Sequence, residues 1–302
     1  MISIIPYNKK YDNEIQKLDR DIFLEVRYHR DVIKEDVILS VDETGSFCGI
    51  GYLLASQSYR MIDRSLNEYF LHAIFRGFGE NEAEASILLL KRLLKLFCLH
   101  AVRLKGKNLK LRLWCKESDT AYLELLYENG FKPIDKMLVM KRSLSEKMPS
   151  LKDIFSKASE NGISLVLTKA RPDESFFNEY LTVNEEAFDL PDSLDDLRFK
   201  LDHYNGAIYA AFAEDTLAAS VTVWQVGAGT LATENIFCGP RFQNKGIAKA
   251  LLGYMLHELK KTEADNAALT VYRNNISAIR LYSSLGYEQV HTLNEMCYEV
   301  TK

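Results

Sequence analysis

An internal repeat sets the strongest constraint on how this chain folds. The segment Leu-Leu-Tyr-Glu-Asn-Gly-Phe at 125–131 resembles Leu-Tyr-Ser-Ser-Leu-Gly-Tyr at 281–287. Each segment follows a strand-like run, and a long amphipathic helix precedes that run in both halves. We expect these runs at 109–114 and 267–272, and the helices at 83–100 and 247–260. The pattern indicates a diverged duplication of one unit rather than a short solenoid repeat.

Further strand-like runs precede each long helix and complete the repeated unit. The turns Glu43-Thr44-Gly45 and Glu214-Asp215 fit hairpin connections between them. Each half then reads as strand, helix, antiparallel meander, long helix, strand, short helix and strand. This order predicts an α/β fold with a mixed (α+β) sheet, present in two tandem domains. The further strands are expected at 37–41, 49–55, 207–213, 217–226 and 231–238.

The boundary between the halves is marked by a change in composition. Residues 141–150 are polar and contain a proline, and a short helical segment at 151–159 follows. Asn161-Gly162 ends that segment, and 163–168 reads as a new first strand. The predicted domains are residues 1–145 and 163–302, joined by a linker at 146–162.

Composition narrows the functional classes for these 302 residues. The formal net charge of −4 argues against a general binder of nucleic acid or of an anionic membrane. The five scattered cysteines include no Cys-x-x-Cys pair, so we expect no disulfide framework and no metal site, in a reducing, cytoplasmic compartment. We expect no secretory leader, because residues 1–7 lack a basic segment followed by a long apolar core. We expect no membrane span, because charges interrupt the apolar stretch at 87–102.

The segment from 234 to 252 carries the clearest chemical signal. A strand ends at Cys238, Gly239-Pro240 makes a turn, and a helix begins near Ile247. Gly246 lets the loop close tightly, so that free backbone N–H groups converge at the helix N-terminus. Such a site suits a phosphate or pyrophosphate, and Arg241 and Lys245 add positive charge.

Two motifs in this half resemble those of one enzyme superfamily. Gln243-x-x-Gly246-x-Ala248 resembles the acyl-CoA pyrophosphate loop of the GNAT acetyltransferases. Downstream, the run from Asn275 through Ala278, Leu281 and Tyr282 to Gly286-Tyr287 is similar to a later motif of the same superfamily. The resemblance covers 163–302 well and 1–143 in outline only.

The resemblance implies an N-acetyltransferase that uses acetyl-CoA as co-substrate, with no metal, and acetylates a primary amine by direct attack. It implies that Tyr282 donates a proton to the departing sulfur, and a phenol with a pKa near 10 is protonated at neutral pH. It also implies that Asn275 hydrogen-bonds the cofactor. The remaining implied cofactor-binding residues are Ile236, Phe237, Cys238, Gln243, Asn244, Lys245, Gly246, Ile247 and Ala248.

Several of these residues also have a purely structural interpretation. The resemblance implies that Glu234 is the candidate general base, because some members of the superfamily use a glutamate in this strand. Strand alternation places it on one face with Ile236 and Cys238, but it could be a solvated carboxylate. Tyr282 could be a core tyrosine, and Asn275 could serve as a helix N-cap, alone or together with a cofactor role. Cys238 is interpreted as a packing residue rather than a nucleophile, because direct transfer needs no acyl-enzyme.

The first half is interpreted as a degenerate copy that holds no cofactor. Aligned by its long helix, Glu80–Ala85 lies opposite Gln243–Ala248, with Ala83 in place of Gly246. The glutamates there would repel a pyrophosphate. In the later motif Leu126 and Asp119 replace Tyr282 and Asn275; a three-residue shift of the alignment would bring Gly79 nearer the loop.

The sequence leaves the acceptor and one alternative function open. A non-catalytic acyl-CoA sensor or scaffold would use the same loop without transfer. A nucleotide-binding enzyme is disfavoured, because no Gly-x-x-x-x-Gly-Lys-Ser/Thr motif is present. The acceptor is expected to be a small-molecule or peptide amine, and the resemblance implies that it binds near 184–204 and parts of the N-terminal half. The tandem arrangement favours a monomer over a homodimer. Acids that could attract a cationic amine, or simply form a solvated helix face, are Glu185, Glu186, Asp189, Asp192, Asp195 and Asp196.

Overall fold

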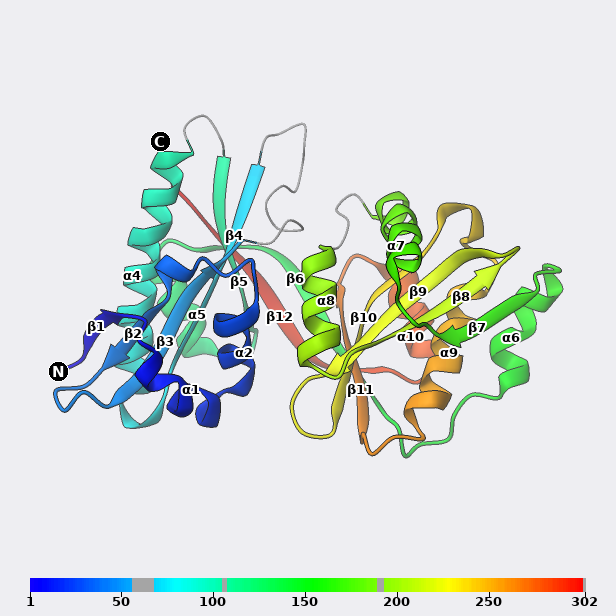
Figure 1. The fold of residues 1–302 in the computed structure, drawn as a ribbon, viewed down its shortest axis with the longest axis horizontal. Coiled ribbons are helices and arrows are strands. Elements are labelled where there is room, and N and C mark those ends of the chain that lie inside the picture. The colour runs from blue at the N-terminus through cyan, green and yellow to red at the C-terminus, as the bar shows by residue number, and fades with distance from the viewer. Residues whose placement is uncertain (56–67, 105–107, 189–192, 301–302) are drawn as a thin grey trace. The chain divides into compact units, whose positions relative to one another are not determined.

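The computed structural model describes residues 1–55, 68–104, 108–188 and 193–300 (Figure 1). The chain divides into two compact units. Unit 1 comprises Met1–Ile134 together with Asn294–Lys302, and unit 2 comprises Asp135–Leu293.

Unit 1 is a mixed sheet in the strand order β1-β2-β3-β4-β5-β12. Strands β1 to β4 pair in antiparallel fashion, and β4 pairs with β5 in parallel. Its elements are β1 (Ser3–Pro6), η1 (Lys9–Tyr11), α1 (Asp12–Leu18), α2 (Arg20–Tyr28), η2 (Lys34–Asp36), β2 (Ile38–Val41), β3 (Phe47–Leu54), β4 (Glu68–Gly77), η3 (Gly79–Asn81), α4 (Glu82–Arg103), β5 (Asn108–Lys116) and α5 (Thr120–Glu128).

Unit 2 follows the same plan in the strand order β6-β11-β10-β9-β8-β7. Strands β7 to β10 form an antiparallel meander, and β10 pairs with β11 in parallel. Its elements are β6 (Lys132–Ser143), α6 (Leu151–Glu160), β7 (Leu165–Lys169), α7 (Glu174–Ala187), α8 (Leu194–His203), β8 (Ala207–Ala213), β9 (Thr216–Gln225), β10 (Thr230–Cys238), η4 (Pro240–Phe242), α9 (Ile247–Leu259), β11 (Asn266–Tyr272), α10 (Ile276–Ser284) and the start of β12 (Glu288–Glu299).

The two halves exchange their last strands. Most of β6, from the first half, pairs with β11 in unit 2, and the end of β12, from the second half, belongs to unit 1. Tyr298 of β12 packs on Phe97 and Phe131 of unit 1, at ring distances of 5.8 and 5.5 Å. Arg142 of β6 donates to the carbonyls of Leu285 and Lys147 in unit 2. The compact units therefore differ from the contiguous domains expected from the sequence.

Each unit buries apolar side chains on both faces of its sheet. In unit 1, α4 and α5 cover one face through residues such as Leu89 and Leu126, while η1, α1 and α2 cover the other through Tyr11, Ile15 and Val26 (Figure 1). In unit 2, α6, α9 and α10 cover one face, and α7 and α8 cover the other. Removal of these apolar side chains from water is the main favourable term that holds each sheet between its helices.

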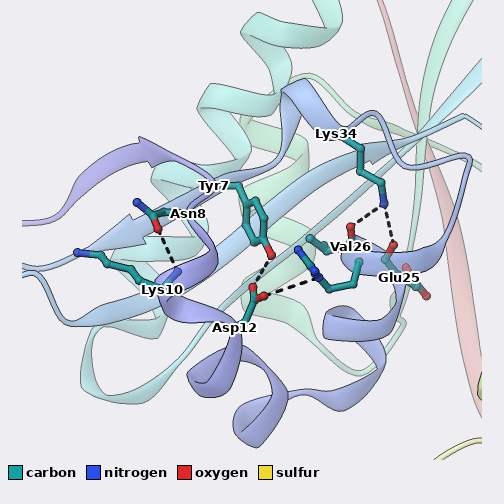
Figure 2. A network of polar contacts seen from close by, with 8 residues as sticks. Tyr7, Asn8, Lys10, Asp12, Glu25, Val26 and Lys34 are labelled. Atoms are coloured by element: carbon teal, nitrogen blue, oxygen red, sulfur yellow. Dashed lines mark hydrogen bonds and ion pairs between the residues drawn. The ribbon is translucent and has the colours of Figure 1, made fainter.

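Polar contacts join the first helices of unit 1 to each other and to the segments beside them (Figure 2). The Tyr7 hydroxyl donates to Asp12, whose carboxylate also lies 3.7 Å from Nε of Arg27. Lys34 donates from Nζ to the Val26 carbonyl at 2.6 Å (Figure 2). It also donates to the His29 carbonyl at 2.9 Å, and so neutralises the C-terminal end of α2.

The structure confirms the repeated order of elements and most of their positions. The expected turn at Glu214-Asp215 is present, with both residues at positive φ, as in a tight hairpin. The strand β4 was not predicted from the sequence, although Tyr69–Phe75 contains the aromatic and β-branched residues typical of a strand. In the described part of the chain, no helix is long and apolar enough to cross a membrane.

Candidate active site

The candidate site in unit 2 opens where two parallel strands part. Registered pairs join 230–232 of β10 to 266–268 of β11, and within the described residues no further pair joins these two strands. Beyond this point side chains span the gap. The Thr233 hydroxyl donates to the Ala268 carbonyl at 3.2 Å, and the Thr270 hydroxyl donates to the Glu234 carboxylate at 3.0 Å. Separated parallel strands expose backbone N–H and C=O groups to a ligand that can pair with them.

A β-bulge lies in the same stretch of β10 and corrects one prediction. The register against β9 shifts between Glu234, opposite Thr222, and Phe237, opposite Ser220, and Asn235 has a left-handed φ of 49°. The extra residue reverses the alternation of faces. Ile236 and Cys238 pack on the cluster beneath α9, whereas Phe237 packs on the α7 and α8 face with Tyr180. Glu234 interacts electrostatically with Lys200 of α8. It therefore lies on the face opposite Ile236 and Cys238, not on the same face as predicted.

The loop after β10 ends in an uncapped helix start. Gly246 is the N-cap of α9, with φ of 86°. Among the α-helices of the described chain, α9 alone begins with neither a side-chain cap nor an acidic residue in its first turn. The N–H groups of this turn and the positive end of the helix are therefore available to an anion.

A cleft of about 530 Å³ joins the parted strand, the loop and α10. It gathers most of the residues that the sequence predicted. Those that line it are Ile236, Phe237, Cys238, Gln243, Asn244, Gly246, Ile247, Ala248, Asn275 and Tyr282. Lys245 and Glu234 are not among the lining residues. The exposed Lys245 carries its ammonium group 5.9 Å from the Phe242 ring, and Gln243 donates from its amide to the Cys238 carbonyl at 3.2 Å.

The ionisable groups around the cleft are shifted by burial. Burial raises the pKa of Tyr282 to about 12, with a further contribution from the nearby Glu234 charge. Burial also raises the pKa of Glu234, while Lys200 and the Thr270 hydrogen bond act in the opposite direction. Burial raises the pKa of the Cys238 thiol to about 11, which leaves little thiolate at neutral pH.

Asn275 is the N-cap of α10. Its side-chain oxygen accepts from the Ala278 N–H at 3.2 Å and from the Ser277 hydroxyl at 3.1 Å. The capping interpretation is thus confirmed. Asn275 also lines the cleft, and its carboxamide carries two N–H donors in addition to the oxygen that caps α10.

Sequence reasoning missed several polar residues of this site. Thr270 contacts Glu234, and Lys157, Lys249 and Arg280 line the cleft. Thr270 could have been found from the repeated strand, as a polar residue between the buried Leu269 and Val271. Lys157 gave no local signal, because only the packing of α6 on α9 brings it to the cleft.

Comparison with known proteins identifies the family of this half. Residues 173–287 match the model of the acetyltransferase (GNAT) family. The C-terminal half of the chain belongs to the GNAT acetyltransferase family. [Ribosomal protein bS18]-alanine N-acetyltransferase of Escherichia coli K12 is 32% identical over 83 residues, which are 28% of this chain and 55% of that protein. The same enzyme of Salmonella typhimurium is 34% identical over 77 residues, 26% of this chain and 51% of that protein. The chain thus spans about half the length of these curated relatives.

Solved structures extend the GNAT fold to the whole chain. A tandem GNAT protein from the clavulanic acid biosynthesis pathway covers 100% of this chain and 99% of its own, with a TM-score of 0.71 and 11% identity. A GCN5-related N-acetyltransferase from Sphaerobacter thermophilus covers 100% and 96%, with a TM-score of 0.68 and 14% identity. At these identities the likeness concerns the fold, which is that of two tandem GNAT-like domains.

The GNAT-like unit 1 differs from unit 2 where the cofactor loop would lie. After β4 and Phe78, η3 runs directly into α4, whereas in unit 2 the four residues Gln243–Gly246 separate η4 from α9. The predicted alignment of Glu80–Ala85 with Gln243–Ala248 is therefore wrong, because the loop is shortened rather than substituted. Gly77 permits the shorter turn, since a Cβ there would collide with the Glu82 carbonyl.

The strands and helices behind that turn also differ between the units. In unit 1, β4 pairs with β5 over five positions, from Glu68↔Asn108 to His72↔Arg112, and its register against β3 runs without a bulge. The rings of Phe75 and Tyr122 then stack 5.4 Å apart between β4 and α5. Leu126 is fully buried, and Asp119 caps α5 as Asn275 caps α10.

Proposed function

We propose that the C-terminal half is an acetyl-CoA-dependent N-acetyltransferase that acetylates a primary amine by direct attack, and that the N-terminal half holds no cofactor. The observation that carries this proposal is the single cleft that joins a parted strand, an uncapped helix start and a buried tyrosine, Tyr282. Each feature answers one need of the reaction: alignment of the thioester, binding of its phosphates, and a proton for the departing sulfur.

The residues of the cleft fit acetyl-CoA by their chemistry. The N–H groups at 246–248 and the positive end of α9 suit a pyrophosphate. The backbone at 236–238, freed from β11, suits the amide groups of a pantetheine arm, and Asn275 can donate a hydrogen bond. When bound, acetyl-CoA supplies an acyl group activated as a thioester.

Glu234 and Tyr282 then have complementary roles. Because burial raises the pKa of Glu234 toward neutral pH, its carboxylate is a better base. It can take a proton from an ammonium group directly or through water. Tyr282, with a pKa of about 12, keeps its phenolic proton and can give it to the leaving sulfur. Cys238 stays a neutral thiol, which supports direct transfer without an acyl-enzyme.

The bulge bears on where the acceptor enters. Glu234 lies on the α7 and α8 face of β10, so we place the acceptor amine on that face, in agreement with the expected region 184–204. Asp189 and Asp192 lie outside the described residues. Asp196 lies 2.7 Å from the Lys200 ammonium, so its charge is already neutralised within α8.

The acceptor class is a small-molecule or peptide amine. The similarity to an enzyme named for acetylating an alanine of a ribosomal protein favours including peptide α-amino groups among the candidates. Because the similarity spans 83 residues, it supports the chemistry more strongly than that particular acceptor.

The test is transfer from acetyl-CoA to a panel of amines, followed as released thiol. The panel should contain peptide N-termini, lysine side chains and small amines. We expect turnover with at least one class, and a fall in kcat of about a hundredfold or more in Tyr282→Phe, with unchanged affinity for acetyl-CoA. Binding of acetyl-CoA without transfer to any amine would favour the alternative, an acyl-CoA sensor or scaffold, and overturn the catalytic proposal.

A further inference from the structure

The helix α6 lies against Gly246, at the end of the loop 243–246, although α6 precedes the residues that match the GNAT family, 173–287. Ile154 and Ala158 of α6 are both 1% exposed, and α6 packs along α9. Two glycines make this close approach possible, Gly253 within α9 and Gly246 at its N-cap. A Cβ on Gly253 would lie 2.5 Å from Cδ1 of Ile154, and one on Gly246 would lie 2.8 Å from Cβ of Lys157.

This packing fixes the backbone of α6 beside the loop and directs Lys157 toward it. Lys157 is exposed and lines the cleft together with Gly246, Asn244 and Ala248. Its ammonium group is carried by a flexible stem that begins in contact with Gly246, at the uncapped start of α9. An ammonium group there adds to the positive potential of the helix end.

Two other cations line the same cleft, Lys249 of α9 and Arg280 of α10. Within the described chain, none of these three side chains forms an ion pair. The chain as a whole carries a net charge of −4, whereas this cleft is lined by three cations that form no ion pair in the described chain. Their convergence matches a ligand with several phosphate charges.

We propose that Lys157 of α6 binds a phosphate group of the acyl-CoA, so that the segment connecting the two halves completes the cofactor site of the second half. This inference rests on the proposed function and assigns a binding residue to it. Acyl-CoA offers two phosphate sources at this end, the pyrophosphate and the 3′-phosphate of the ribose. Both are anionic oxygens that a lysine ammonium can contact.

The test compares acetyl-CoA affinities of the full chain and two lysine variants by calorimetry. Lys157→Ala should weaken binding about tenfold, the usual loss for one charge-assisted contact. Lys152→Ala is the matched control, because Lys152 is exposed on the same helix but does not line the cleft, and its affinity should stay within about twofold of wild type. Thermal unfolding of all three proteins verifies that α6 remains folded.

Dephospho-CoA distinguishes the two phosphate sources. If Lys157→Ala weakens binding of CoA but not of dephospho-CoA, Lys157 binds the 3′-phosphate; if it weakens both equally, Lys157 binds the pyrophosphate. Wild-type protein that binds acetyl-CoA while Lys157→Ala binds it equally well overturns this inference and leaves the proposed function intact. Wild-type protein that binds no acetyl-CoA overturns both.

Discussion

Substitution of Gly246 by alanine should destabilise unit 2 for two separable reasons. The first is the left-handed backbone, because φ is 86° and a Cβ is disfavoured there by about 1–2 kcal/mol. The second is contact with α6, because the new Cβ would lie 2.8 Å from Cβ of Lys157 and 3.0 Å from the backbone nitrogen of Ala158. Since backbone atoms cannot rotate away, this overlap should add about 1–3 kcal/mol.

Gly162 provides the matched control for the backbone contribution. Its φ is 67°, and apart from its two chain neighbours no residue of the described chain has an atom within 4 Å of a Cβ built on it. Gly162→Ala should therefore lower the free energy of unfolding by only about 1–2 kcal/mol, and Gly246→Ala by about 2–5 kcal/mol. Urea denaturation, followed by circular dichroism, measures both.

Gly253 separates the effect on stability from the effect on the cleft. Gly253→Ala disturbs Ile154 of α6 and should cost about 1–3 kcal/mol, but this glycine does not line the cleft. Its acetyl-CoA affinity should therefore fall less than that of Gly246→Ala, which alters the cleft directly as well as its packing on α6. If Gly246→Ala is no less stable than Gly162→Ala, the predicted contact between α6 and the loop does not exist.

Three further predictions concern pH and local stability. Activity should rise with pH as Glu234 ionises. Thr270→Val removes a hydrogen bond that stabilises the carboxylate, so it should move this rise to higher pH. A pH profile of kcat/KM identical to that of wild type would contradict the assigned base. Burial lowers the pKa of His72 to about 3, so between pH 6.5 and 3 only the unfolded chain protonates this residue. Lowering the pH from 8 to 5 should therefore reduce the free energy of unfolding by about 2 kcal/mol. His72→Phe should remove this loss and keep the stack on Trp114. Urea midpoints that fall equally in both proteins would argue against it. Lys34→Met should cost unit 1 about 1 kcal/mol, because the end of α2 loses its cation, and an unchanged urea midpoint would show that these bonds are fully replaced by water.

The sequence predicted the features that depend on residues close together in the chain. The loop at 243–248 and the helix that carries Tyr282 each form within one motif, so their geometry follows from local spacing. The repeated strands and long helices were likewise found from periodicity. These residues meet in one cleft because the parallel strands β10 and β11 carry them to the same edge of the sheet.

The missed features depend on packing between distant segments. The bulge adds one residue to β10 opposite β9, and the period-2 alternation of side chains in the sequence cannot predict that extra residue. The exchange of β6 and β12 was hidden because both are copies of the same strand. Gly130 faces Tyr298 as Gly286 faces Arg142, so each strand fits the same place in either unit. Local sequence thus specified the strand but not the unit that it completes.

The number of acetyl-CoA molecules bound by each chain tests whether unit 2 alone holds the cofactor. Calorimetric titration of the full chain should give one site, which Gly246→Glu should abolish, because a carboxylate there meets the phosphates and the side chain meets α6. Two sites would show that unit 1 binds cofactor despite its shortened loop. No site would contradict the assignment of the cleft itself.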